Sequence, residues 1–407
     1  MTQRAGMETP MTMGALSGIS VLELGSMVAA PYCAKLLADL GADVVKLETP
    51  GLGDPARRRG PFPDDVPHLE RSALFLYLNT SKRGVTLELG GETGRTIFRD
   101  LVRDVDVLIE DWTPGELERI GLGYSLLSEL NPGLIVSSIT PFGQSGPYRG
   151  YRSHHLNLYH ASGHSSPFHV PGAAEGRPPP KAGGYLGDYD AGLTAAIGTS
   201  AAVIGRATSG RGQHVDLSKQ EAMMCMERVD IGRLTNDPNP QRRRMVGGLT
   251  RAKDGYLMVT PLEKHQWESL IRAMGDPDWS KADWCKEESG RLEHAAEAKE
   301  HIDEWAGGLT RDEIYHACQA AGTPAGPVRN VAEVRAWEQA KAREFFVEIE
   351  HPVAGTQVYP TAPYRFSKTP WAGSSAALLG EHNEEVYCDG LGHTRQELAR
   401  LASAGVI

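Results

Sequence analysis

The sequence lacks the features that mark secreted and membrane-embedded proteins. Its five cysteines are scattered and odd in number, with no CxxC pair, which argues against a disulfide framework and a thiolate metal site. The longest run of small apolar residues, 193–204, is shorter than the ~20 residues that a membrane-spanning helix needs. The first fourteen residues contain no charged segment followed by an apolar one, so we expect no signal peptide. These absences together predict a cytoplasmic protein that does not act at a membrane.

An excess of positive charge is also missing. The net charge of −10 argues against nucleic acid as a general partner, because neutralising phosphates requires clustered Lys and Arg. It does not exclude an anionic small molecule, which a few local basic groups can hold. Glycine (46) and proline (26) are plentiful but follow no period, so the 407 residues are typical of a loop-rich globular protein with one large or two modest cores.

What is present is an alternation of short apolar runs with helical patterns. Such an alternation is typical of a doubly wound α/β fold, in which a parallel sheet is covered by helices on both faces. The predicted strands are 19–24, 43–48, 84–89, 107–110 and 134–139, and the predicted helices between them are 28–40, 92–102 and 122–130.

The second half of the chain has a less regular pattern. Residues 147–184 are rich in Gly, Pro, Ser and His, and a loop of that length tends to be functional. Beyond it, we predict strands at 214–217 and 255–259, and a polar linker at 235–244. The predicted helices are 186–204, 219–234, 267–274, 295–305, 314–321 and 394–402.

The turn after the first strand lacks the glycines of a dinucleotide-binding fingerprint. It contains Gly25-Ser26-Met27-Val28-Ala29-Ala30-Pro31 instead of GxGxxG, which argues against nicotinamide and flavin chemistry. Glu48, at the end of the second strand, could contact a ribose, and an ordinary helix-cap or loop charge is about as consistent with its position.

Basic residues gather near the predicted strand ends. Ligands of open α/β sheets bind at the carboxyl ends of strands, and a polyphosphate would need such groups. Each residue taken alone is more often a solvated charge. The residues are Arg57, Arg58, Arg59, Lys82, Arg83 and Arg119.

Asp188 lies between small residues, in Gly187-Asp188-Tyr189-Asp190-Ala191-Gly192. The flanking glycines would allow a ligand to approach the backbone, which favours a catalytic carboxylate. An equally good interpretation is an N-cap, in which the side chain accepts a free amide hydrogen at the start of the next helix. Asp190 is compatible with the same role.

Four histidines lie within eleven residues: His154, His155, His160 and His164. Their spacing is not that of a zinc site and no carboxylate cluster accompanies them, so we expect no metal. One of them could act as a general base, although an ordinary hydrogen-bonded histidine is the commonest outcome for each.

An ordered set of motifs across nearly the whole chain resembles the class III CoA-transferases, the formyl-CoA and carnitine CoA-transferase family. Each motif is weak alone, and their order makes the set specific. They include Ala30-Pro31-Tyr32, Gly41-Ala42-Asp43-Val44-Val45-Lys46, Asn79-Thr80-Ser81-Lys82-Arg83-Gly84, Gly143-Gln144-Ser145-Gly146-Pro147, Gly187-Asp188, Gly210-Arg211-Gly212-Gln213, Gly326-Pro327-Val328 and Leu379-Gly380-Glu381-His382.

The resemblance implies a large α/β domain built from both chain ends, a small inserted α+β domain and an interlocked homodimer. The implied boundaries are 15–218 for the first part of the large domain, 219–245 for a linker helix and linker, 246–325 for the small domain and 326–407 for the return to the large domain. The implied activity is transfer of CoA from an acyl-CoA thioester to a carboxylic acid, with acyl-CoA as a substrate and no permanently bound cofactor.

The resemblance also implies roles for residues. It makes Asp188 the nucleophile, which attacks the thioester to give an aspartyl anhydride and then an aspartyl-CoA thioester. Gly247 and Gly248 resemble a short glycine-rich substrate loop, and we expect residues 162–181 to shape the acyl pocket. The predicted CoA contacts are Val28, Ala29, Leu87, Leu89, Asp111, Trp112, Thr113 and Arg119.

Two departures from the family pattern leave alternatives open. Thr49 stands where the family often has an arginine that contacts the adenosine phosphate, so we expect the contact to come from Arg57–Arg59, with Arg58 as the candidate. His154 stands where the related α-methylacyl-CoA racemases have a catalytic histidine, and in them it shuttles an α-proton with the equivalent of Asp188. The alternatives are therefore a racemase that uses His154 and Asp188, and an acyl-CoA-binding relative without turnover.

Overall fold

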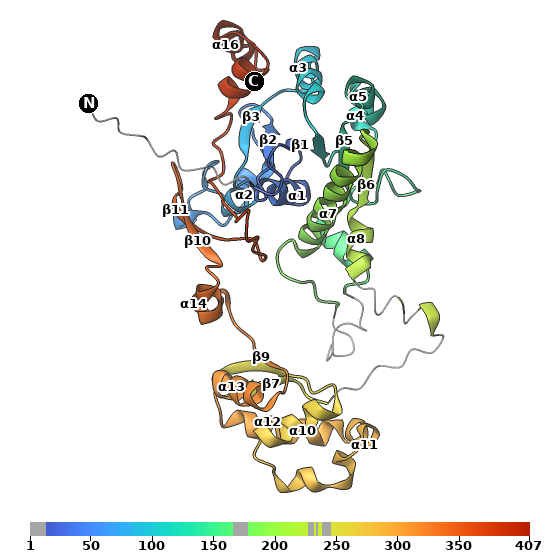
Figure 1. The fold of residues 1–407 in the computed structure, drawn as a ribbon, viewed down its shortest axis with the longest axis vertical. Helices are drawn as coiled ribbons and strands as arrows, with labels where there is room; N and C mark the ends of the chain where they lie inside the picture. Colours follow the sequence, from blue (N-terminus) through green and yellow to red (C-terminus); the bar gives the residue numbers. More distant parts are fainter. Residues whose placement is uncertain (1–13, 166–177, 227–231, 233–234, 238–245) are drawn as a thin grey trace, which may run out of the picture. The chain divides into compact units, whose positions relative to one another are not determined.

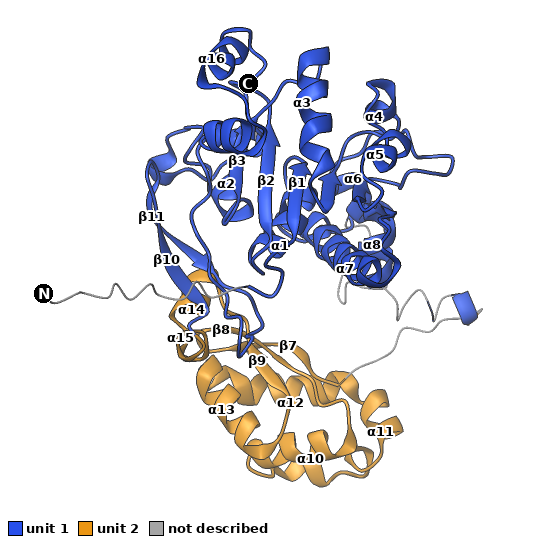
Figure 2. Cartoon of the chain, turned by 45° about the horizontal axis from the view of Figure 1, so that its top comes forward, with its two compact units in different colours: residues 1–236, 344–407 blue, residues 237–343 orange. Residues whose placement is uncertain are grey.

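The computed structural model describes residues 14–165, 178–226, 232, 235–237 and 246–407. The chain forms two compact units, one made of residues up to 236 together with 344–407, and one made of 237–343 (Figure 2). Residues 326–343 thus belong to the second unit. No helix among the described residues is long and apolar enough to cross a membrane.

A six-stranded parallel sheet forms the centre of the first unit (Figure 1). Its order is β3-β2-β1-β4-β5-β6, so the chain builds outward from β1 in one direction and from β4 in the other. This arrangement confirms the predicted doubly wound α/β fold. The strands are β1 (Ser20–Leu24), β2 (Asp43–Glu48), β3 (Arg83–Thr86), β4 (Val107–Glu110), β5 (Ile135–Thr140) and β6 (His214–Ser218).

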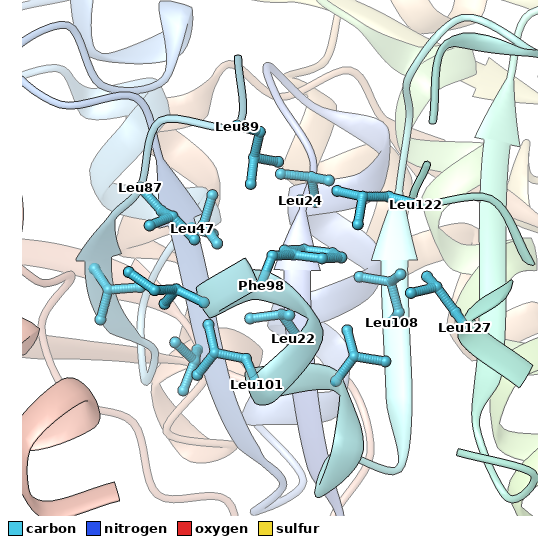
Figure 3. Packing of buried hydrophobic residues seen from close by; sticks show 14 of the residues in the cluster. Leu22, Leu24, Leu47, Leu87, Leu89, Phe98, Leu101, Leu108, Leu122 and Leu127 are labelled. Carbon is cyan, nitrogen blue, oxygen red and sulfur yellow. The ribbon is translucent and has the colours of Figure 1, made fainter. Parts of the chain in front are cut away.

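Helices cover both faces of this sheet because side chains alternate along each strand. Leu22 and Leu108 belong to the cluster around Phe98, a residue of α3. Figure 3 shows the ring of Phe98 pointing into a group of leucines. Val21 and Ile109 face the opposite cluster, built from the small residues of α1 and α7. The helices of this unit are α1 (Ala29–Ala38), α2 (Ala73–Leu78), α3 (Glu92–Arg103), α4 (Glu116–Arg119), α5 (Tyr124–Leu130), α6 (His155–Ala161), α7 (Leu186–Ser209), α8 (Lys219–Met226) and α16 (Arg395–Ser403).

The C-terminal segment covers the outer edge of β3. The backbone N–H of Gly84 donates to Nδ1 of His382 at 3.1 Å, and that of Thr86 donates to Oδ1 of Asn383 at 2.8 Å. The hydroxyl of Tyr387, which is fully buried, donates to the Thr86 carbonyl at 2.8 Å. The edge groups are therefore paired within the chain, which protects the sheet from edge-to-edge association. A hairpin of β10 (Phe346–His351) and β11 (Gly355–Pro360) precedes this segment.

The second unit has its own core. Its antiparallel sheet has the order β7-β8-β9, and alternate residues of β7 and β8 pack with Trp267, Leu270 and Ile302 of the helices. The elements are β7 (Gly248–Ala252), β8 (Gly255–Val259), β9 (Ala325–Pro327), α10 (Lys264–Ala273), α11 (Glu288–Glu293), α12 (Ala295–Gly307), α13 (Arg311–Ala321), α14 (Val331–Ala336) and α15 (Glu338–Ala342).

Several predicted boundaries differ from the observed ones. The strand predicted at 84–89 ends at Thr86, where the chain leaves the sheet and Leu87 and Leu89 pack into the core. The irregular stretch 147–184 contains the helix α6, which the glycine-rich composition around it concealed. The helix predicted at 219–234 is described to Met226; the residues that follow, most of the linker and much of the 162–181 loop lie outside the described residues.

Candidate active site

The loops after β1 and β4 meet at the carboxyl edge of the sheet. The strand order reverses between these two neighbouring strands, and such a switch point is where open α/β sheets bind ligands. The Ser26 N–H donates to Oδ2 of Asp111 at 3.0 Å, which ties the two loops together. Met27 has φ +61, a conformation that is uncommon outside glycine, and its N–H donates to Oδ1 of Asp54 at 3.0 Å. These bonds fix the position of the first loop at the switch point.

One cavity of about 280 Å³ lies at the ends of β1, β2 and β4. The predicted CoA contacts Leu87, Leu89, Trp112 and Arg119 line it together with Thr49. Arg119 is exposed and forms no ion pair with any residue that the structure describes, so its guanidinium is available to an anion. The structure therefore brings these four residues together around one space.

A second cavity of about 540 Å³ adjoins the first, and Ser26 lines both. Val28, Asp111, Thr113, His154 and Asp188 all line this second cavity, so the two candidate catalytic residues share one space. Ala29 lines neither cavity, because it is buried under α7, where its carbonyl oxygen faces Gly192.

The Asp188 carboxylate lies in the first turn of α7, two residues inside the helix. The N-cap is Tyr185, so the interpretation of Asp188 as the N-cap is wrong. The residue is 9% exposed, and its Oδ1 lies 3.1 Å from Nζ of Lys219. An ionised side chain in this position is also favoured by the positive end of the helix dipole. Asp190, the other candidate cap, lies further inside the same helix.

The glycines beside Asp188 serve helix packing. A Cβ on Gly187 would lie 2.1 Å from the sulfur of Met223 in α8, and a Cβ on Gly192 would lie 2.6 Å from the carbonyl oxygen of Ala29 in α1. Both positions are close approaches between helices, which gives the glycines a role in packing, and access of a ligand to the backbone stays a prediction. They let α7 pack tightly enough to place its first turn over the switch point.

Lys219 is a site residue that the sequence reasoning missed. It begins α8 directly after β6, and its side chain is 16% exposed at the wall of the second cavity. A signal was available, because Lys219 follows the carboxyl end of a predicted parallel strand, where ligand-binding side chains gather. Arg149 and Arg152 also line this cavity, and neither forms an ion pair within the described part of the chain.

Burial perturbs two neighbouring carboxyl groups after β4. It raises the pKa of Asp111 to about 6, although the nearby Lys219 ammonium and the Ser26 N–H act in the opposite direction. It raises the pKa of Glu110 to about 7, against hydrogen bonds from Ser138 and the backbone of Trp112. Burial therefore disfavours the charged form of both carboxyl groups, and it does so more strongly for Glu110 than for Asp111.

The four histidines have different environments. His154 and His155 line the second cavity, and the ring of His155 packs edge-on against Tyr185 at 4.7 Å. The pKa of His155 is lowered, chiefly because burial disfavours its charged form. His160 pairs with Ser165 at 2.6 Å and His164 with the Met223 carbonyl of α8 at 3.0 Å, so each of these two rings is held by a hydrogen bond within the chain. Among the residues described, no group of three His, Cys, Asp or Glu side chains could hold a metal ion.

Arg57, the first residue of the segment Arg57–Arg59, does not provide the phosphate contact that was expected from this segment. Its side chain is fully buried, donates through Nε and Nη2 to Glu48 at 2.7 and 2.8 Å, and also pairs with Glu70. The ion pair with Arg57 engages both carboxylate oxygens of Glu48, so it accounts for the position of Glu48 without a contact to a ribose. Arg58 is exposed, donates to the Leu52 carbonyl and lines neither cavity.

Gly247 and Gly248 belong to the second unit, where Gly248 is the first residue of β7 and Gly247 directly precedes it. Gly247 has φ +86, and a Cβ there would lie 2.3 Å from the Val259 carbonyl oxygen. The fold of that unit therefore requires glycine at position 247. A Cβ on Gly248 would meet nothing within 4 Å, and the role of both residues as a substrate loop stays a prediction.

Several known proteins are similar in sequence to this chain over nearly its whole length. The chain is 33% identical to the succinyl-CoA–L-malate CoA-transferase β subunit of Chloroflexus aurantiacus, over 96% of this chain and 98% of that protein. It is also 33% identical to the formyl-CoA:oxalate CoA-transferase of Streptomyces coelicolor, over 98% and 100%. A CaiB/BaiF family protein of Brucella suis has the same fold, with a TM-score of 0.80, 29% identity and coverage of 93% and 99%.

The family assignment follows from these similarities and from a match to a family as a whole. The sequence model of CoA-transferase family III matches residues 16–383, which include both loops of the switch point, Asp188 and the whole second unit. The chain therefore belongs to CoA-transferase family III, and it is an enzyme of that family.

Proposed function

We propose that this enzyme transfers CoA from an acyl-CoA to a carboxylic acid, with Asp188 as the nucleophile. The observation that carries the proposal is the position of Asp188, a nearly buried carboxylate on the wall of a cavity that adjoins a second one at the switch point. CoA extends from the first cavity, near Arg119, to the second, where the thioester meets Asp188. The similarity to two CoA-transferases supports the same activity.

In the first half of the reaction, the free oxygen of Asp188 attacks the thioester carbon and the C–S bond breaks. This step leaves an aspartyl anhydride and a CoA thiolate. The thiolate then attacks Cγ of Asp188, the bond from Cγ to the bridging oxygen breaks, and the donor acid departs with that oxygen. The product is an aspartyl-CoA thioester, and the covalent route divides one difficult exchange into easier steps.

In the second half, the acceptor carboxylate attacks Cγ of the aspartyl-CoA and displaces the thiolate. A second anhydride forms, and the thiolate attacks its acceptor-derived carbonyl. The new acyl-CoA leaves, and Asp188 is restored with one oxygen that came from the acceptor acid. Because anhydrides hydrolyse, the recessed position of Asp188 favours transfer over loss to water.

Two arginines support an acceptor with a second negative group. Arg149 and Arg152 line the cavity of Asp188 without an ion pair among the described residues, and guanidinium groups bind carboxylates well. The similar transferases are named for malate and oxalate, which are both dicarboxylic acids. We therefore favour a dicarboxylate as the acceptor.

The proposed assembly is an interlocked homodimer. An apolar stripe on α7, made of Leu186, Leu193, Ile197 and Ile204, is 43%, 43%, 64% and 73% exposed. Apolar side chains repeated along one helix face are typical of a surface that a partner covers. A second copy of the chain fits this surface, and Ile197→Glu should lower the mass of the assembly measured by light scattering.

The covalent route has a direct isotopic test. An acceptor acid labelled with ¹⁸O in its carboxylate, turned over with unlabelled acyl-CoA in unlabelled water, should place ¹⁸O in the side chain of Asp188. Mass spectrometry of the peptide that contains Asp188 should show the label there and not at Asp190 on the same helix. Omission of acyl-CoA is the control, because no anhydride can then form.

Transfer without any ¹⁸O in Asp188 would refute the aspartyl route. Turnover in the same assay would also eliminate the alternative of a binding protein without activity. The racemase alternative is supported by one observation, that His154 and Asp188 line the same cavity. It requires exchange of the α-proton, so a 2-methylacyl-CoA in D₂O should gain deuterium without any acceptor, and the absence of deuterium would dismiss it.

A further inference from the structure

The ion pair between Lys219 and Asp188 has a defined geometry. Nζ of Lys219 lies 3.1 Å from Oδ1 of Asp188, and the two side chains are 16% and 12% exposed. Among the described residues, no other side chain or N–H donates to either carboxylate oxygen of Asp188. The pair thus leaves Oδ2 free to attack an acyl group, while Oδ1 faces an ammonium.

Charge moves onto Oδ1 at defined points of the proposed reaction. When the thiolate or the acceptor carboxylate attacks Cγ, the C=O bond to Oδ1 opens and that oxygen carries the negative charge. A donor that is effective at such a moment lies 2.7–3.1 Å from the developing oxyanion. The Lys219 ammonium already lies at that distance from Oδ1.

We propose that Lys219 stabilises the oxyanion on Oδ1 during the two attacks on Cγ of Asp188. The inference rests on the proposed function, since it concerns steps of that reaction. In each step a bond from S or O to Cγ forms, the electron pair of the C=O moves to Oδ1, and its return expels the leaving group from Cγ. Lys219 keeps its proton throughout, so it acts by charge and is neither acid nor base.

A second carboxylate explains how the ammonium stays in place. Acylation removes the negative charge of Asp188 and with it the partner of Lys219. Asp111 lies within electrostatic reach of Lys219 and lines the same cavity, and its Oδ2 is anchored by the Ser26 N–H at 3.0 Å. The ammonium therefore retains an anionic neighbour while the acyl-enzyme exists.

The first step of the reaction depends on Lys219 in a different way. Attack of Oδ2 on the thioester places the negative charge on the oxygen of the acyl group, away from Oδ1. Loss of the ammonium should therefore spare anhydride formation and slow the return of the thiolate to Cγ. A variant without the charge should release free CoA and hydrolyse its anhydride, which a general structural defect would not produce.

The test compares Lys219→Met, Lys219→Arg and the wild type, with Lys281→Met as a matched control. Lys281 belongs to the second unit, is 70% exposed and pairs with Asp278, so its loss removes one exposed charge that lines neither cavity. Transfer is measured with a donor acyl-CoA and a dicarboxylic acid. Release of free thiol without acceptor is measured with a disulfide dye, and aspartyl-CoA is identified by mass spectrometry of the intact protein.

We expect Lys219→Met to lower kcat for transfer about 10²–10³-fold, with KM for acyl-CoA changed less than about threefold. Free thiol should accumulate and aspartyl-CoA should become scarce. Lys219→Arg should recover transfer to within about tenfold of the wild type, because a cation remains, and Lys281→Met should match the wild type.

The inference fails if Lys219→Met transfers CoA normally, or if its thiol release falls together with transfer, which would indicate a structural role. Binding of acyl-CoA and the Tm are measured on each variant, and if Lys219→Met does not fold, Lys219→Gln replaces it and is judged by the same criterion. Detection of aspartyl-CoA on the wild type is a separate check. If aspartyl-CoA is absent there, the proposed function and this inference both fail. If it is present and Lys219→Met transfers CoA normally, only the inference fails.

Discussion

Replacing Gly192 with alanine should damage the contact between α1 and α7. A Cβ at this position would lie 2.6 Å from the carbonyl oxygen of Ala29 and 3.1 Å from two side-chain carbons of Tyr32. The carbonyl belongs to the helix backbone and cannot rotate away, so α1 and α7 must separate. This contact also sets the position of Asp188, which lies four residues earlier and therefore on the same face of α7.

The expected magnitude follows from two opposing effects. Alanine is a better helix former than glycine by about 1 kcal/mol, which favours the variant. Overpacking of a tight contact costs about 1–3 kcal/mol. The net effect is a loss of up to about 2 kcal/mol in the free energy of unfolding. A displacement of about 1 Å at a reacting group can cost about 100-fold in rate, so a shift of a few tenths of an ångström should lower kcat several-fold or more.

Gly198→Ala in the same helix is the control. Its Cβ would meet only Cγ1 of Val215 at 3.4 Å, an ordinary contact, so this variant should gain up to about 1 kcal/mol. Calorimetry gives the Tm of both variants, and the transfer assay gives kcat and KM. If Gly192→Ala were as stable and as active as Gly198→Ala, the claim that this glycine sets the position of Asp188 would be wrong.

Four further predictions concern charged residues. Glu110→Gln should become more stable than the wild type, by up to about 3 kcal/mol, as pH rises from 5 to 8. Burial raises the pKa of Glu110 from 4.5 to about 7, so over most of this window the native protein holds a proton that the unfolded chain has released, and its stability falls with rising pH until the native carboxyl also ionises; equal pH profiles of Tm would refute this. Arg57→Met should lower the free energy of unfolding by about 3–5 kcal/mol, because the buried carboxylate of Glu48 would lose its cationic partner. A small change in Tm would contradict this prediction. Arg119→Gln should raise KM for acyl-CoA about tenfold or more at nearly constant kcat, and an unchanged KM would separate Arg119 from CoA. Arg149→Gln with Arg152→Gln should raise KM for a dicarboxylate and not for a monocarboxylate of similar size, and equal effects on the two acids would refute the acceptor assignment.

Much of the fold could be predicted because its signals are local. The strands 43–48, 107–110 and 255–259 were predicted with their observed bounds, since each is a short apolar run between turn residues. The parallel arrangement followed from the alternation of strands and helices. The helix α6 was missed because its seven residues lie within a glycine-rich segment that has no clear apolar period.

The sequence could predict a residue of the candidate site where the residue and its immediate neighbours form a recognisable motif. Asp188 was identified from its motif and its place before a helix, and the structure puts it on the wall of the larger cavity at the switch point. The sequence could not show that the flanking glycines fit against α1 and α8, because those contacts join segments distant along the chain.

Only the tertiary structure decided which charged residues are available to a ligand. Arg57 and Arg58 are alike as sequence, yet the fold buries Arg57 against Glu48 and leaves Arg58 exposed outside both cavities. Lys219 meets Asp188 across 31 positions because β6 ends at the same edge of the sheet where α7 begins. The sequence by itself determined the elements and the candidate nucleophile, since helix and strand patterns depend on near neighbours. Partners of a buried charge depend on which elements the sheet brings together, and that is a property of the folded chain.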